Sequence, residues 1–162
     1  MKSRGAPYII LRPNWFSDNF HTYWLQMITS GVIALPVGDS RTSFVDARDI
    51  AASAAAALQS SRFDCRAFTL TGSEALTYAE AAAQLSKATG RKIASVDVDK
   101  ETFVASQIAA GMPEDLAREL AMLLHVVKMG YAAHVTHDVQ ELTGRTPITV
   151  AQYAQDYAAL WS

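Results

Sequence analysis

The sequence predicts an α/β fold in which a few mostly parallel strands are followed by a C-terminal part rich in helices. Residues 8–11 and 66–70 are short segments typical of strands. The segments between and after them repeat apolar residues at helical spacing. No stretch of the 162 residues is rich enough in proline, glycine or serine to form a linker, so we expect a single domain over residues 1–162.

The first predicted strand, Tyr8–Leu11, is continuously apolar and ends before Pro13, which favours a central strand covered on both faces. It follows Met1 by only seven residues, so we expect no earlier strand to precede it in the sheet. One amphipathic helix is expected between Ser17 and Gly31, because apolar residues recur there at helical spacing. An extended piece follows at 32–36.

A second extended piece at 43–45 leads into a helix that starts at Asp46 and runs to Leu58. Six alanines within its part from Ile50 to Leu58 predict close packing against a neighbouring element. After the strand at 66–70, Thr77 and Glu80 have the spacing of a capping box and predict the next helix.

The C-terminal part is predicted to contain one further short strand and several helices. The strand is expected within 92–99, and a helix within 100–110. Pro113 stands in the favoured first-turn position of the next helix. That helix is expected to dock on the core through Leu116, Leu120, Leu123, Leu124 and Val127. The last helical segment, 149–161, carries an aromatic stripe of Tyr153, Tyr157 and Trp161 that must cover part of the core.

Composition and motifs argue against several classes of function. A net charge of −2 with no basic stripe argues against nucleic-acid binding. The single cysteine, Cys65, and the lack of a leader or membrane-length apolar run predict a cytoplasmic protein that does not enter a membrane. His134 and His137 have no evident third ligand, so no metal site is expected. No G-x-S-x-G string supports a hydrolase.

Four segments form an ordered set with characteristic spacing, and this set identifies a family more specifically than any single segment does. The segments are Leu11-Arg12-Pro13-Asn14-Trp15-Phe16-Ser17-Asp18-Asn19-Phe20, Phe44-Val45-Asp46-Ala47-Arg48-Asp49-Ile50-Ala51, Phe68-Thr69-Leu70-Thr71-Gly72 and Leu142-Thr143-Gly144-Arg145-Thr146-Pro147. Together they resemble the C-terminal half of NmrA-like proteins, an atypical branch of the short-chain dehydrogenase/reductase superfamily. This branch includes redox sensors and NAD(P)H-dependent quinone or azo-dye reductases. The resemblance runs from about residue 8 to the end of the chain and implies a partial Rossmann-like fold.

The resemblance also implies a ligand pocket at the end of the first strand. The residues that would line it are Pro13, Asn14, Trp15, Phe16, Asn19 and Phe20. The segment 100–129 would form a substrate-binding lobe over the same pocket. An alternative from the residues themselves is that the aromatic stripe of Trp15, Phe16, Phe20 and Trp24 belongs to the hydrophobic core, and this alternative is favoured about two to one.

The Gly-rich turn that would bind a dinucleotide is missing from the sequence. None of the eight glycines has G-x-G-x-x-G or G-x-x-G-x-x-G spacing, and no lysine follows a tyrosine by four residues. We therefore expect no cofactor, no catalytic residue and no metal in this chain. NAD(P)H is expected only if a separate N-terminal half completes the fold.

Two hypotheses follow. The first, favoured about two to one, is a truncated NmrA-like module that has no dinucleotide site of its own, binds a small apolar ligand or a protein partner, and forms a homodimer through the bare edge of its first strand. The second is the substrate-binding half of an NAD(P)H-dependent quinone or azo-type oxidoreductase. In that case the nucleotide-binding half lies upstream or on another chain.

Overall fold

The computed structural model describes residues 6–161 and has an α/β architecture, as the sequence predicts. The strands are β1 (Ile9–Pro13), β2 (Val32–Leu35), β3 (Arg41–Thr42), β4 (Arg66–Leu70), β5 (Leu76–Thr77) and β6 (Ala94–Asp97). The α-helices are α1 (Leu25–Thr29), α2 (Ala47–Leu58), α3 (Tyr78–Thr89), α4 (Lys100–Ala109), α5 (Glu114–Lys128), α6 (Asp138–Thr143) and α7 (Val150–Asp156). Three 3₁₀ helices complete the list: η1 (Ser17–His21), η2 (Ser61–Phe63) and η3 (Ala158–Trp161).

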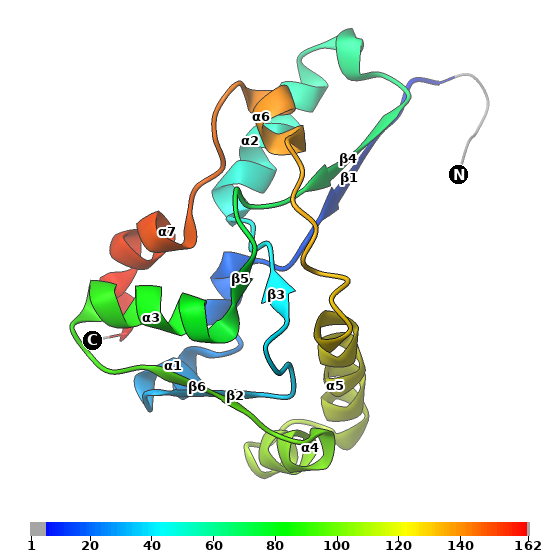
Figure 1. Ribbon diagram of the computed structural model, residues 1–162. Coiled ribbons are helices and arrows are strands. Elements are labelled where there is room, and N and C mark those ends of the chain that lie inside the picture. Colours follow the sequence, from blue (N-terminus) through cyan, green and yellow to red (C-terminus); the bar gives the residue numbers. More distant parts are fainter. Residues whose placement is uncertain (1–5, 162) are drawn as a thin grey trace.

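The strands form three pairs, of which two are parallel. β1 pairs with β4 and β2 pairs with β6 in parallel, whereas β3 and β5 are antiparallel. In Figure 1, α2 and α6 lie beside the β1–β4 pair at one end of the molecule, and α4 and α5 stand at the other end. The prediction of a few mostly parallel strands with a helix-rich C-terminal part is confirmed.

The prediction that β1 is covered on both faces is wrong for the described residues. Ile9 and Leu11 are partly buried against a small apolar cluster, whereas Ile10 is 40% exposed. Successive side chains of a strand point to opposite faces, so one face of β1 is packed and the other is open. Within residues 6–161 only β4 pairs with β1.

The segment between Ser17 and Gly31 is not one helix, because it breaks at Thr22 into η1 and α1. The backbone of Thr22 is non-helical, with φ −117° and ψ −93°. Tertiary bonds fix the first turn: Ser17 N–H donates to the Val45 carbonyl, and the Asp18 carboxylate accepts from Ala47 N–H. These contacts with distant residues override the local helical pattern.

Two predicted helix starts are confirmed by their caps. The Asp46 carboxylate accepts from Arg48 N–H at the start of α2. Thr77 and Glu80 form both bonds of a capping box at the start of α3. Pro113 is the N-cap of α5 and does not occupy its first turn, so that prediction is displaced by one residue.

The apolar face predicted for the helix after Pro113 is partly wrong. The buried residues of α5 are Ala117, Ala121, Leu124 and Val127. Leu116 and Leu123 are about half exposed. The small side chains of the two alanines let α5 pack closely on the core along their own stripe, which turns the neighbouring leucines away from the core.

The alanine-rich helix α2 is close-packed on one face only. Ser53 and Ala57 are buried, whereas Ala51 and Ala55 are exposed. Its core is the small cluster beneath β1 and β4, and most other buried side chains form a separate, larger cluster. The larger cluster includes the predicted C-terminal stripe, in which Tyr153 and Trp161 are fully buried. No helix among residues 6–161 has both the length and the hydropathy required to cross a membrane.

Candidate functional site

The chain segment that leaves β1 is fixed by backbone hydrogen bonds on both sides. Asn14 N–H donates to the Leu70 carbonyl at 2.9 Å and so extends the pairing with β4. Val45 N–H then donates to the Trp15 carbonyl, also at 2.9 Å. The segment therefore follows the carboxyl ends of two parallel strands, which is where open α/β sheets bind ligands.

The Asn14 side chain joins three segments that are distant in sequence. Its amide nitrogen donates to Ser43 Oγ at 2.6 Å and to the Ala132 carbonyl at 2.8 Å. Ser43 Oγ in turn donates to the His134 carbonyl at 2.6 Å. The loop between α5 and α6 passes beside β3 in Figure 1, so these bonds fix the position of α5 relative to the segment after β1. No pattern in the sequence indicates this role of Ser43.

An open cleft, here called the outer cleft, lies between the segment after β1 and α5. Its volume is about 430 Å³. The lining residues are Pro13, Asn14, Trp15, Phe16, Asn19, Tyr23, Leu123 and Val126. Five of the six pocket residues expected from the sequence are thus brought together around one hollow, and α5 covers it from the other side, as expected of the segment 100–129.

A smaller and more enclosed hollow, the inner cleft, adjoins the outer cleft and shares Trp15, Asn19, Tyr23 and Leu123 with it. Its volume is about 220 Å³. The other lining residues are Trp24, Met112, Leu116, Glu119 and Leu120. Most of this lining is apolar or aromatic, which is typical of sites for small organic molecules.

The sixth predicted pocket residue, Phe20, lines neither cleft. It is fully buried, and its ring centroid lies 5.1 Å from that of Phe44 and 5.5 Å from that of Trp24. The aromatic stripe is therefore divided: Phe20 and Trp24 are core residues, whereas Trp15 and Phe16 reach the surface. Trp24 is a core residue that also lines the inner cleft.

Sequence reasoning missed the cleft residues contributed by Tyr23 and by individual positions of α5. Tyr23 is 72% exposed, and its place beside Trp15 depends on the break at Thr22. Leu116 and Leu123 were expected in the core. The two leucines are seven residues apart and so lie on one face of α5. This second apolar stripe was the signal in the sequence that could have placed them in a cleft.

Comparison with known proteins gives a consistent set of relatives, although no family model matches the chain. The NAD(P)H azoreductase of Xenophilus azovorans is 34% identical over 159 residues, which is 98% of this chain and 56% of that protein. An uncharacterised oxidoreductase of Bacillus subtilis is 33% identical over 96% of the chain and 55% of its own length. The chain is homologous to the C-terminal half of NmrA-like reductases. It spans about half the length of the curated relatives that it matches.

Solved structures support the same assignment to NmrA-like reductases. The NADPH-dependent quinone oxidoreductase of Escherichia coli, complexed with NADPH, has a TM-score of 0.86 at 25% identity over 94% of this chain and 54% of that chain. The triphenylmethane reductase of Citrobacter has a TM-score of 0.82 at 27% identity, again over 94% of this chain. The transcriptional regulator NmrA has a TM-score of 0.69 at 15% identity, which shows a shared fold.

The starts of the four longest helices of this NmrA-like half are poorly suited to a dinucleotide pyrophosphate. Helix N-termini bind phosphate through free N–H groups and a positive dipole end. Each of the four longest helices instead begins with acidic side chains: Asp46 and Asp49 in α2, Glu80 in α3, Asp99 and Glu101 in α4, and Glu114 and Asp115 in α5. A phosphate at any of these four ends would meet negative charge.

The strongest charge cluster lies at the start of α2. Asp46 is 1% exposed and is bound by Arg48, which also pairs with Asp156 at 2.7 Å. Burial raises the pKa of the neighbouring Asp49 carboxyl above its usual value, although Ile148 N–H donates to it. These residues cap and fasten helices, and none of them lines either cleft.

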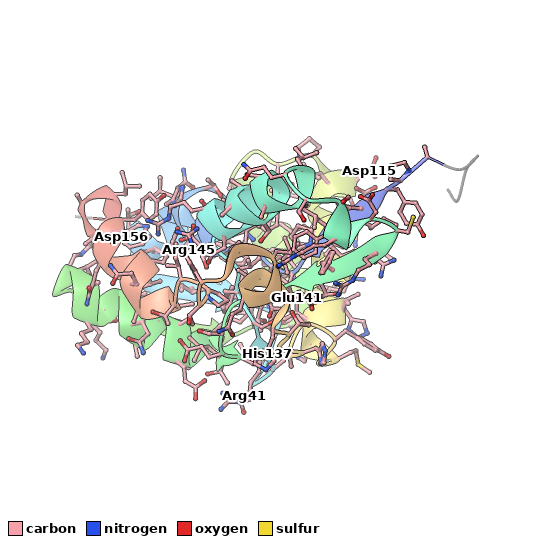
Figure 2. The ribbon with its side chains drawn as sticks, turned by 90° about the horizontal axis from the view of Figure 1, so that it is seen from above. Arg41, Asp115, His137, Glu141, Arg145 and Asp156 are labelled. Carbon is pink, nitrogen blue, oxygen red and sulfur yellow. The ribbon has the colours of Figure 1, made fainter. Side chains whose placement is uncertain are left out.

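No group of three metal-ligating side chains occurs within residues 6–161. His134 and His137 are both exposed. Figure 2 shows His137 at the start of α6, with Glu141 further along the same helix. Glu141 is engaged by Arg66 of β4 at 2.6 Å, which fastens α6 to the β1–β4 pair.

Proposed function

We propose that this chain is a ligand-binding module of reductase type, in which the inner and outer clefts bind a flat and largely apolar molecule. The observation that carries the proposal is the enclosure of Trp15, Asn19 and Tyr23 by Leu123 at the carboxyl end of the parallel pair β1–β4. Relatives named as an azoreductase and a quinone oxidoreductase act on molecules of this shape. The module has no dinucleotide site of its own in this proposal.

The alternative is that the module acts as the substrate half of an NAD(P)H-dependent reductase when a nucleotide-binding half is supplied. The acidic side chains at the starts of α2, α4 and α5 support this alternative, because they favour a cofactor site that lies on a separate half. Calorimetry with NADPH alone tests the premise that both cases share, which is that the isolated chain has no dinucleotide site. We expect no tight binding to the isolated chain, and micromolar binding would contradict the absence of a dinucleotide site.

The cleft proposal predicts quenching of tryptophan fluorescence by a quinone or an azo dye, for which menadione and methyl red serve as ligands. Trp15 lines both clefts, so a bound ring would lie beside its indole. The substitution Leu123→Glu places a charge between the two clefts and is expected to weaken binding about tenfold. The measurement is the dissociation constant from the fluorescence titration.

Leu160→Glu is the matched control, because Leu160 is also about half exposed but lines neither cleft. It is expected to bind both ligands as the wild type does. If the wild type and Leu123→Glu bind the ligands with equal affinity, the clefts are not the ligand site.

We also propose that the chain self-associates through β1. Within the described residues, one edge of β1 has no partner strand, and Ile10 on this strand is exposed. A groove of about 510 Å³ between β1 and α2 supports an association surface here, and its lining includes Ile9, Leu11 and Ala57. Unpaired strand edges with apolar neighbours tend to pair. The expected state is a dimer at micromolar concentration.

Ile10→Lys is expected to shift this dimer to monomer in sedimentation equilibrium, because a lysine on an edge strand opposes pairing. Ile108→Lys is the control, since Ile108 is 41% exposed on α4, remote from β1 in Figure 1. A wild-type chain that stays monomeric at these concentrations would refute the proposal.

A further inference from the structure

The inner cleft combines aromatic rings with a single carboxylate. Trp15, Tyr23 and Trp24 supply the rings, and Glu119 of α5 is the one Asp, Glu, Lys or Arg residue among the lining residues. The outer cleft has no such residue in its lining. The joined clefts are therefore net negative, and the negative charge lies at the enclosed end.

The two indoles of the inner cleft stack on each other, with Trp24 buried and Trp15 partly exposed. The ring planes of Trp15 and Trp24 are inclined by only 20°, and their centroids are 6.1 Å apart. The face of an indole carries negative electrostatic potential and attracts cations, more strongly than the faces of other side-chain rings. A flat ring against this surface would gain from a positive charge of its own.

The Glu119 carboxylate is available for a ligand. No ion pair of Glu119 occurs among the described residues. Its sequence neighbour Arg118 is engaged by Glu114 at 2.8 Å and by Glu101 at 3.4 Å. Further along α5, Lys128 pairs with Asp97. Arg118 and Lys128 of α5 are thus directed to other carboxylates, and neither of them lines the cleft.

We propose that the inner cleft selects planar aromatic cations over neutral rings of the same size, and that Glu119 is the specificity-determining residue. This inference rests on the proposed function, because it requires that the clefts bind the ligand. The ring stacks on Trp15 beside Trp24, and the cationic centre lies toward the Glu119 carboxylate. A partly exposed ion pair together with a cation–π contact favours the cation about three- to tenfold in affinity.

The test compares N-methylacridinium, a permanent cation, with acridine, which is neutral at mildly alkaline pH and has nearly the same shape. Fluorescence anisotropy of each ring gives its affinity for the full chain. We expect the wild type to bind the cation about three- to tenfold more tightly at low salt. Glu119→Gln should reduce this preference to the part that the cation–π contact supplies and leave the affinity for acridine unchanged.

Asp115→Asn is the control, because it removes the same charge from the same helix at a residue that lines neither cleft. It should retain the preference for the cation. Equal wild-type affinities for the two rings, a preference that Glu119→Gln leaves undiminished, or an equal loss in both variants would overturn the role of Glu119.

The same experiment separates this inference from the proposed function. If acridine binds and Leu123→Glu weakens it, the clefts are the ligand site whatever the result for the cation. If neither ring binds, or if Leu123→Glu has no effect on acridine, the proposed function fails and the selectivity proposal fails with it.

Discussion

Replacing Gly72 with alanine is expected to lower the free energy of unfolding by about 3 kcal/mol or more, since a backbone overlap cannot be relieved by a rotamer change. A Cβ atom at Gly72 would lie 2.1 Å from the Phe44 carbonyl oxygen. That oxygen belongs to the segment that continues into Val45, which binds Trp15 and Ser17 through its backbone. Urea denaturation followed by circular dichroism measures the loss.

The overlap at Gly72 also predicts a loss of ligand binding, because the displaced Phe44 segment positions one wall of the clefts. Gly90→Ala is the matched control. Gly90 has φ +68° and no atom within 4 Å of an added Cβ, so only the left-handed backbone is penalised, by about 1 kcal/mol. Equal destabilisation by the two substitutions would show that the approach of Gly72 to Phe44 is not tight in solution.

Trp161→Ala is expected to destabilise the fold by about 3–5 kcal/mol, the usual range for removing a buried tryptophan. The Trp161 side chain is fully buried, and its ring centroid lies 5.9 Å from that of Tyr153. Its indole N–H donates to the Phe20 carbonyl at 3.0 Å and so fastens the C-terminal segment beneath η1. Thermal and urea unfolding of the variant give the value.

Trp161→Phe separates packing from hydrogen bonding at this position. It keeps an aromatic ring but removes the donor, so a smaller loss of about 1–2 kcal/mol is expected. A loss as large as that of the alanine variant would assign most of the effect to the bond with Phe20. A loss below about 1 kcal/mol for Trp161→Ala would contradict the buried position of the side chain.

Local signals in the sequence were sufficient where a short-range bond decides the structure. Asp46 and Thr77 act as caps within one turn of their helices, and both are confirmed. Of the six pocket residues that the resemblance to NmrA-like proteins implied, all but Phe20 lie around one hollow: Pro13, Asn14, Trp15, Phe16 and Asn19.

The remaining differences arise from contacts between distant residues. The break at Thr22 depends on bonds from Ser17 and Asp18 to residues about 28 positions away, which no helical period records. The exposure of Leu116 and Leu123 depends on which stripe of α5 meets the core. The stripe that contains the small residue Ala117 packs there, so the two leucines face away from the core. Asn14 and Ser43 meet only because β1 and β3 end near the same loop.

The central claim is that the clefts between the segment after β1 and α5 bind a flat ligand. Titration of the isotope-labelled chain with menadione, followed by two-dimensional NMR, tests it most directly. The account predicts that the largest chemical-shift changes occur at Trp15, Asn19, Tyr23 and Leu123, including the indole N–H of Trp15. Changes confined to the groove between β1 and α2, or none at saturating ligand, would contradict it.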